Sequence, residues 1–175
     1  MTTQMQFVPG EAVEVSLPEN THCRVRLVDC VGYMVEGALG MLEEGTPRMV
    51  RTPWFDEEVP FEVAAETGTR KVITEHSTLG IVVTTDGSIT DLPREAYLPA
   101  EQRVVSELSA LGKPFVVVIN SQDPGCAAAQ NLQQELSEAY GVPVMALDVL
   151  HMEEADVADL LTAVLYEFPA RQMHL

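Results

Sequence analysis

An aspartate followed three residues later by a glycine is the first feature of this sequence that could do chemistry. Asp29 closes an apolar, strand-like run, and Gly32 completes the pattern Asp-x-x-Gly. A carboxylate at a strand end can hold Mg²⁺ through a water molecule, and a glycine there lets a backbone N–H approach a terminal phosphate. The same two residues also fit an ordinary turn after a strand. The pattern therefore leaves a nucleotide site and a plain turn as alternatives.

A second polar group follows the apolar run 115–120. Guanine-binding proteins carry Asn-Lys-x-Asp at the corresponding point, where the aspartate accepts a hydrogen bond from the base edge. Here the sequence is Asn120-Ser121-Gln122-Asp123, with Ser121 in place of the lysine. It is either a degraded base-recognition loop, in which Asn120 and Asp123 contact the base, or a plain turn through Asp123, Pro124 and Gly125.

Two threonines, Thr2 and Thr3, lie just ahead of the first predicted strands. A threonine at that place can ligate Mg²⁺ and sense a γ-phosphate from a switch loop. Without such a ligand, the pair is simply a frayed chain end. The order Thr, Asp-x-x-Gly, Asn-x-x-Asp is shared with P-loop GTPase-like domains after their first helix. The phosphate-binding string Gly-x-x-x-x-Gly-Lys-Ser/Thr does not occur in the sequence.

Weaker candidates surround the Asp-x-x-Gly pattern. Tyr33 occupies the place where many GTPases orient water with a glutamine, and a phenol is a poor substitute. Arg48 and Arg51 could reach phosphate charge, or pair at the surface with the acidic residues 56–58. Cys30 is more simply a buried structural cysteine than a reactive thiol, because no base lies near it in the sequence.

The elements that would position these residues alternate between strand and helix. Residues 12–17 and 23–29 predict an antiparallel hairpin. Residues 31–60 show no periodicity, contain the adjacent aromatics Trp54 and Phe55, and predict a long, functional, switch-like loop. From residue 61 the patterns predict helices and strands in alternation, over residues 61–77, 79–85, 98–111, 115–120, 127–140, 143–149 and 153–168. Such crossovers favour a mostly parallel sheet with helices on both faces.

The composition of the chain disfavours several classes of function. The chain has 175 residues, which fits one domain, and a formal net charge of −17. That charge disfavours sequence-independent nucleic-acid binding and docking on an anionic membrane through a basic patch. The three cysteines show no framework spacing and predict free thiols. Free thiols are typical of a reducing compartment, so we expect a cytoplasmic protein. No apolar run reaches transmembrane length and no signal peptide is evident.

Several runs together resemble one family, the stage IV sporulation protein A ATPases of spore-forming bacteria. Residues 26–33 (RLVDCVGY) are similar to the family's Walker B and switch II entry. Further similar runs are PRM (47–49), TPW (52–54), GTRKVI (68–73), EHST (75–78), TTDG (84–87), GKPF (112–115), VINS (118–121) and LYEFP (165–169).

The resemblance implies a P-loop-NTPase-like (GTPase-like) α/β fold that lacks its first strand and P-loop, in one partial ATPase domain over residues 1–175. It implies ATP and Mg²⁺ as ligands of the complete domain. Asp29 would be the Walker B magnesium aspartate, and Thr2 and Thr3 the switch threonines, with Thr3 on the metal. Gly32, Asn120 and Asp123 would contact the nucleotide.

The resemblance also implies a role. Family members are cytoplasmic ATPases that polymerise around the developing spore, on the mother-cell side, as the basement layer of its coat. Their implied partners are further copies of themselves, coat proteins and a small amphipathic membrane-anchoring peptide, with no nucleic acid. Because the Walker A segment is missing, we expect this chain to be inactive alone. The alternatives are a non-catalytic assembly module, or a diverged GTPase with Asp123 as the base reader.

The missing strand has a geometric consequence. In GTPase-like sheets it lies between the strand that ends in Asp-x-x-Gly and the next parallel strand, here residues 23–29 and 79–84. We therefore expect that the sheet shows a gap, closes by direct pairing of those strands, or borrows a strand from another chain.

Overall fold

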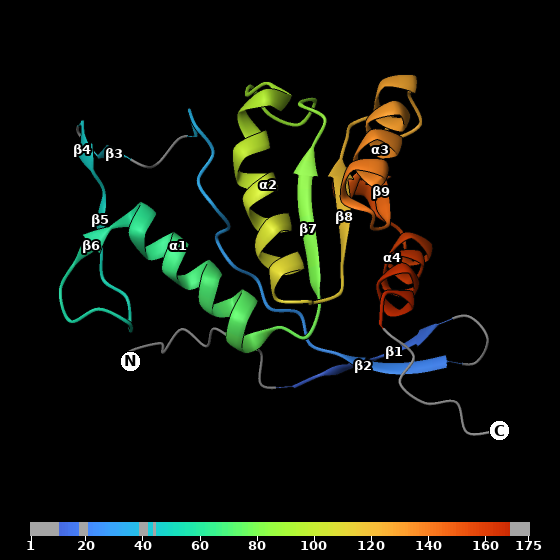
Figure 1. The fold of residues 1–175 in the computed structure, drawn as a ribbon, viewed down its shortest axis with the longest axis horizontal. Helices are drawn as coiled ribbons and strands as arrows, with labels where there is room; N and C mark the ends of the chain where they lie inside the picture. Colours follow the sequence, from blue (N-terminus) through green and yellow to red (C-terminus); the bar gives the residue numbers. More distant parts are fainter. Residues whose placement is uncertain (1–10, 18–20, 39–41, 44, 169–175) are drawn as a thin grey trace.

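A three-stranded parallel sheet forms the centre of the fold (Figure 1). The computed structural model describes residues 11–17, 21–38, 42–43 and 45–168. The strand order is β7 (Gly80–Thr85), β8 (Phe115–Asn120) and β9 (Val144–Leu147). The central strand β8 is apolar and β-branched along its length, because both of its faces are covered.

Helices cover both faces of this sheet, as the sequence predicts. On one face, α2 (Arg94–Ala110) and α3 (Ala127–Tyr140) pack against the odd-numbered side chains of β8. On the other, α4 (Glu154–Tyr166) packs against Val116 and Val118. Because side chains alternate between the two faces of β8, this strand contributes to two separate apolar clusters.

Helix ends follow local sequence signals. The Sγ of Cys126 accepts a hydrogen bond from the Ala129 N–H at the start of α3, and Gly141 ends that helix with a φ of 66°. Only a residue that tolerates a left-handed conformation closes a helix in this way without strain. The start of α4 is a capping box between Glu153 and Asp156.

The N-terminal elements form a hairpin and a long irregular segment. The hairpin consists of β1 (Val13–Leu17) and β2 (Thr21–Val25), which pair antiparallel. The later short strands are β3 (Leu42–Glu43), β4 (Thr46–Pro47), β5 (Met49–Val50) and β6 (Val59–Pro60). They lead into α1 (Phe61–Lys71), which continues as the π-helical turn η1 (Val72–His76). The 3₁₀ turn η2 (Val149–His151) follows β9.

The predicted strand over residues 23–29 is wrong at its C-terminal end, because β2 stops at Val25. Its register with β1 runs out there: Val13 at the start of β1 pairs with Val25. Residues 26–35 continue without regular secondary structure. The apolar residues of this segment do not make a strand, since no neighbouring strand among the described residues accepts their backbone hydrogen bonds.

The predicted start of the second helix at Leu98 and Pro99 is also wrong. Helix α2 begins at Arg94, and Pro99 lies inside it. A proline inside a helix removes one backbone hydrogen bond. The first turn is nevertheless fixed, because the Arg94 side chain bonds Thr84 of β7 and Glu101 about two turns further along.

The edge of β7 facing away from β8 has no strand partner among the described residues. Direct pairing of the strands over residues 23–29 and 79–84 is not seen, because β2 belongs to a separate sheet, and the described sheet ends at the free edge of β7. Segment 28–33 runs past this edge without pairing with it. No helix in the described part of the chain is long and apolar enough to span a membrane.

We predict that Leu108→Ala lowers the free energy of unfolding by about 2–5 kcal/mol. Leu108 is 2% exposed and fills the core between α2 and the start of β7. Urea unfolding monitored by circular dichroism measures the change. The matched control is Leu111→Ala at the end of the same helix, where the side chain is 47% exposed. Equal losses for the two variants would contradict this account of the core.

Candidate functional site

A cavity of about 440 Å³ lies beside the unpaired edge of β7. Segment 28–33 forms its opposite wall, and α1 and α2 contribute side chains to its remaining sides. The apolar lining is mostly β-branched, including Val28, Val31, Val72, Ile81 and Val83. The lining is therefore mainly apolar, and Asp29, Thr84 and Glu101 add polar groups to it.

Asp29 and Gly32 belong to the wall of this cavity and do not follow a strand directly. The Asp29 side chain is exposed. The Gly32 N–H donates to the hydroxyl of Thr69 in α1 at 3.0 Å, and that hydroxyl donates back to the Gly32 carbonyl at 3.1 Å. Thr69 is 2% exposed, so the backbone of Gly32 is held by a buried partner. Glycine suits this position, since its φ is 82°.

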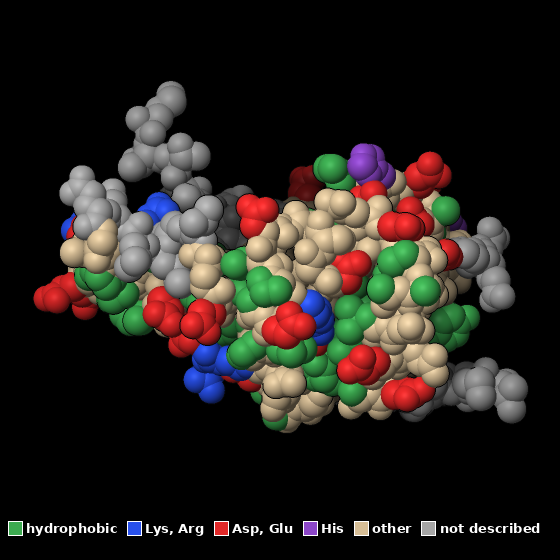
Figure 2. Space-filling view, turned by 90° about the horizontal axis from the view of Figure 1, so that it is seen from above, with side chains coloured by type: hydrophobic (Ala, Val, Ile, Leu, Met, Phe, Trp, Pro, Cys, Tyr) green, Lys and Arg blue, Asp and Glu red, His purple; other side chains and the backbone are tan. Residues whose placement is uncertain are grey.

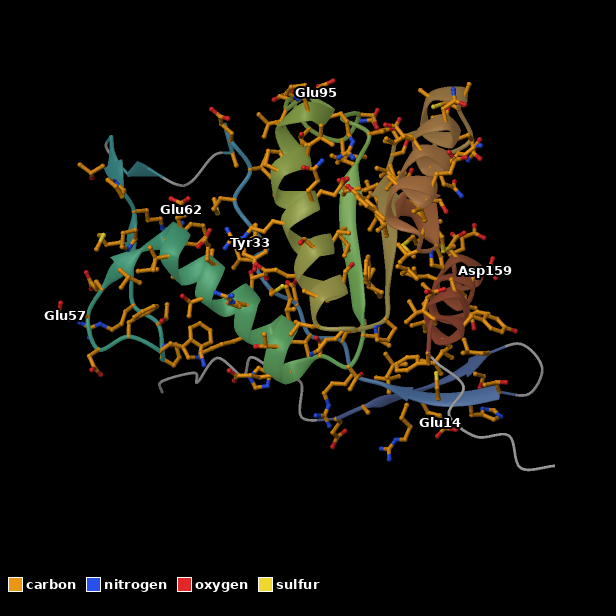
Figure 3. All side chains as sticks on the ribbon, viewed as in Figure 1. Glu14, Tyr33, Glu57, Glu62, Glu95 and Asp159 are labelled. Atoms are coloured by element: carbon orange, nitrogen blue, oxygen red, sulfur yellow. The ribbon has the colours of Figure 1, made fainter. Side chains whose placement is uncertain are left out.

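Tyr33 is buried between α1 and α2 (Figure 3). Its hydroxyl donates to Glu107 of α2, and the guanidinium of Arg103 lies 3.9 Å from its ring centroid. Arg103 in turn pairs with Glu66 of α1. Burial, followed by the hydrogen bond to the Glu107 carboxylate, raises the pKa of Tyr33 above its usual value. The phenol stays protonated and bonded to Glu107, so it does not stand free to orient water.

The carboxyl ends of the strands meet in a separate polar cluster. The Ser121 hydroxyl donates to Asp86 at 2.6 Å, and Asp86 also accepts from the N–H and hydroxyl of Ser88. Burial alone would raise the pKa of Asp86, but the hydrogen bonds from Ser121 and Ser88 outweigh it and hold the pKa below its ordinary value. Ser121, which replaces the lysine of guanine-binding proteins, therefore joins the ends of β7 and β8.

Asn120 and Asp123 lie at the same end of the sheet. The Asn120 side-chain oxygen accepts from the Val149 N–H at 3.1 Å, which joins β8 to the turn after β9. The Asp123 carbonyl accepts from the Cys126 N–H at 3.1 Å, as expected of the plain-turn alternative, and its side chain is exposed. The nucleotide roles of both residues stay predictions.

A buried ion pair between α2 and β7 was not among the residues that the sequence singled out. Arg94 and Glu101 approach to 2.6 Å, with side chains 13% and 1% exposed. Thr84 accepts from Arg94, and the Tyr140 hydroxyl donates to Glu101. Burial opposes ionisation of Glu101, but its hydrogen bonds with Arg94, Thr84 and Tyr140 outweigh it and lower its pKa. One sequence signal could have revealed this pair. Glu101 lies four residues before the apolar Val105 and so on the same, inward helix face, where a charged residue needs a buried partner.

The two polar regions contact opposite ends of α2, while Asp29, Thr84 and Glu101 line the same cavity. Tyr33 contacts Glu107 in the last part of α2, whereas Arg94 at the first residue of the helix reaches Thr84 near the tip of β7. Thirteen helical positions separate Arg94 from Glu107, which is about 20 Å. Figure 3 shows the same separation, with Tyr33 well below Glu95 along α2. Thr2 and Thr3 lie outside the described residues.

The donor chemistry of Asp29 fits part of a magnesium site. Mg²⁺ is commonly bound through one or two carboxylates together with substrate phosphates and water. Asp29 offers one exposed carboxylate on the cavity wall. Among the described ranges, no group of three or more His, Cys, Asp or Glu side chains is placed to hold a metal ion. The metal role of Asp29 stays a prediction.

The long loop that carries the arginines packs on α1. A Cβ on Gly68 would lie 3.4 Å from the indole of Trp54, so this aromatic side chain rests against the helix. Arg48 lies 5.5 Å from the ring centroid of Phe61, and Arg51 is 4.0 Å from Glu58 at the surface. The described arginines of this loop therefore contact neighbouring side chains of the loop and of α1.

A parallel sheet flanked by helices on both faces, with polar residues at its carboxyl edge, defines an α/β domain of the P-loop-NTPase-like ATPase class. The chain belongs to the family described as "Stage IV sporulation protein A, ATPase domain", whose model matches residues 1–169.

Curated relatives agree with this assignment. The chain is 49% identical to Stage IV sporulation protein A of Bacillus anthracis, 50% to that of Bacillus subtilis (strain 168) and 49% to that of Clostridioides difficile (strain 630). Each match covers 100% of this chain and 36% of the relative. The chain thus spans about a third of the length of these relatives. No solved structure matches it.

We predict that Glu101→Gln lowers the free energy of unfolding by about 3 kcal/mol, because the Arg94 guanidinium would remain buried without a counter-charge. Denaturant unfolding tests this. The control is Glu95→Gln, an exposed position near the start of the same helix, where a change within about 0.5 kcal/mol is expected. A Glu101→Gln protein as stable as the control would show that the ion pair contributes little.

The same pair predicts an acid-labile contribution to stability. The pKa of Glu101 is lower in the folded state than in the unfolded chain, so the folded state favours the ionised form. Its contribution is therefore complete above about pH 4.5 and is lost as pH falls through the folded pKa. We expect Glu101→Gln to lose less stability than the unaltered protein between about pH 5 and pH 3. Parallel pH profiles of the two proteins would count against this assignment.

Proposed function

We propose that this chain is one part of the core of a Mg²⁺-dependent ATPase that drives or locks assembly of a spore coat protein. The observation that carries the proposal is the unpaired edge of β7 above an apolar cavity, in a chain that belongs to an ATPase-domain family. An unpaired strand edge offers a row of backbone donors and acceptors to a further strand.

In this proposal the cavity beside β7 receives the strand that carries the phosphate-binding loop. The β-branched lining suits an extended apolar segment, and the open edge of β7 suits a parallel partner. The motif Gly-x-x-x-x-Gly-Lys-Ser/Thr does not occur in these 175 residues. The chain alone therefore lacks the backbone cradle and lysine for the β- and γ-phosphates, and we expect no hydrolysis from it by itself.

The roles of the individual residues follow from their chemistry. Asp29 would hold Mg²⁺ through a water molecule, and the Gly32 N–H would donate to the terminal phosphate. Thr2 and Thr3 would sense the γ-phosphate, with Thr3 on the metal. The bound Mg²⁺ would neutralise phosphate charge during phosphoryl transfer to water. The protein's own residues would hold the terminal phosphate in position.

The arrangement at the strand tips favours ATP over GTP. Ser121 is buried and bonded to Asp86, so it cannot reach a guanine base as a lysine would. The side-chain oxygen of Asn120 is already bonded to the backbone after β9. The alternative of a diverged GTPase keeps one supporting observation, the exposed carboxylate of Asp123 at this edge.

The whole-protein role is part of the same proposal. We infer a cytoplasmic protein on the mother-cell side of the forespore that polymerises with copies of itself and contacts coat proteins and a small amphipathic anchoring peptide. Figure 2 looks onto the end of the molecule where the strands terminate and shows far more acidic than basic side chains. That surface suits basic partner segments and disfavours nucleic acid.

The alternative is a purely non-catalytic assembly module that binds protein partners through its acidic surface and the Trp54–Phe55 loop. Both residues are half-buried, and Trp54 packs against Gly68 of α1. This aromatic pair therefore offers less free surface for a protein partner than its sequence indicated. The acidic surface still supports that alternative, so hydrolysis must be measured.

We predict that Asp29→Asn lowers ATP hydrolysis by about 10–100-fold, the usual cost of changing a group that acts on a metal through a water. The assay uses the chain extended by the preceding segment of the Bacillus subtilis relative, with ATP and Mg²⁺. The matched control is Asp159→Asn, an exposed change on α4 at the other face of the sheet (Figure 3).

Three outcomes would contradict parts of the proposal. An extended, folded protein that hydrolyses no nucleotide would favour the assembly module. Faster hydrolysis of GTP than of ATP would favour the diverged GTPase, with Asp123→Ala as its test. Equal activity of Asp29→Asn and the control would remove Asp29 from the metal site.

A further inference from the structure

The Asp-x-x-Gly segment is fixed by two independent anchors that the proposed ATPase reaction does not use. Thr69 of α1 holds both the N–H and the carbonyl of Gly32. One residue further on, Tyr33 bonds Glu107 of α2 and lies under Arg103. Arg103 also pairs with Glu66, so this second anchor joins α1 to α2 as well.

The first anchor occupies the group that a phosphate would need. The Gly32 N–H is a single donor, and at 3.0 Å it is committed to the Thr69 hydroxyl. While that bond lasts, Gly32 cannot donate fully to a phosphate oxygen. An N–H bond to a charged phosphate is roughly twice as strong as one to a neutral hydroxyl, so phosphate can replace Thr69 if it comes within reach.

The second anchor holds Tyr33 beside the last turns of α2. Tyr33 reaches the last turns of α2, and a Cβ on Gly80, the first residue of β7, would lie 2.9 Å from Leu108 in those turns. The residues expected around a nucleotide lie instead at the strand tips, where Arg94 meets Thr84. Gly32 nevertheless lines the same cavity as Thr84 and Glu101. Its N–H must therefore leave Thr69 before it can bond a phosphate in that cavity.

We propose that Thr69 and Tyr33 are positioning residues that park the Asp-x-x-Gly segment against α1 and α2, and that ATP with Mg²⁺ releases it by taking over the Gly32 N–H. This inference rests on the proposed function for its nucleotide step only. The parked state lowers the apparent affinity for ATP, because only the released fraction of molecules is competent to bind.

The test of parking uses Cys30, a half-buried free thiol two residues before Gly32 on the cavity wall. In a Cys23→Ser, Cys126→Ser background, the rate of labelling by a thiol reagent reports how often the segment opens. Serine at position 126 retains an acceptor for the start of α3. The measurement needs no nucleotide and uses the chain as it is.

We expect Thr69→Val to raise the Cys30 labelling rate roughly fivefold, since it removes one hydroxyl that bonds Gly32 twice. Thr69→Ser keeps the hydroxyl and should restore the rate to within about twofold. Tyr33→Phe keeps the buried ring but loses the bond to Glu107, and should also raise the rate. Circular dichroism confirms that each variant is folded. Unchanged labelling in both Thr69→Val and Tyr33→Phe would overturn the parking role.

The nucleotide step is tested in the extended protein. ATP with Mg²⁺ should change the Cys30 labelling rate in the unaltered segment, because it moves the segment from Thr69 to the ligand. Thr69→Val should lower the apparent dissociation constant for ATP up to roughly fivefold. Simple structural damage would weaken binding instead. Active hydrolysis with no change of labelling on ATP addition would overturn nucleotide-driven release.

Failure of the proposed function gives a different result. An extended protein that neither binds nor hydrolyses ATP would overturn that function and the release step with it. The labelling of the nucleotide-free chain would still decide whether Thr69 and Tyr33 hold the segment.

Discussion

The backbone of β7 is the constraint on which the rest of this structure depends. Its hydrogen-bonding groups are paired with β8 on one edge, while the other edge faces an apolar cavity and segment 28–33. Buried backbone groups without partners are costly, so a sheet of this kind favours addition of a further strand. Helices pack on both faces of the sheet, and the long N-terminal segment passes beside the free edge of β7.

Helix α2 connects the two polar regions of the molecule. Its first turn is bound to β7 through Arg94 and the buried carboxylate of Glu101, and its last turns bind Tyr33 through Glu107 and Arg103. A rigid helix with specific contacts at both ends can couple the strand tips to the Asp-x-x-Gly segment. Such coupling requires that the contacts at one end can switch between two arrangements. In this arrangement the buried ion pair fixes one end of the helix, and the contacts of Tyr33 form the end that could change.

Local sequence signals predicted the fold where they agreed with the long-range contacts. The bounds of α3 and β8 match the prediction, because a left-handed glycine ends the helix and a continuous β-branched run makes the strand. Prediction failed where contacts with residues far away in the sequence determine the bounds of an element. Helix α2 starts at Arg94 because Thr84 and Glu101 hold that residue, and no periodicity shows this. The apolar residues before Asp29 suggested that the strand continues to that residue. Strand β2 instead ends at Val25, because this residue pairs with Val13, the first residue of β1. The bond between Gly32 and Thr69 spans 37 positions, beyond any motif.

The contact between Trp54 and Gly68 gives the protein an optical reporter of its own. Trp54 is the single tryptophan of the chain, and its indole lies against α1 one residue away from Thr69. Indole emission shifts to longer wavelength when water replaces an apolar neighbour. The intrinsic fluorescence of the unlabelled protein therefore follows one event, the separation of the long loop from α1, in real time and without added dye.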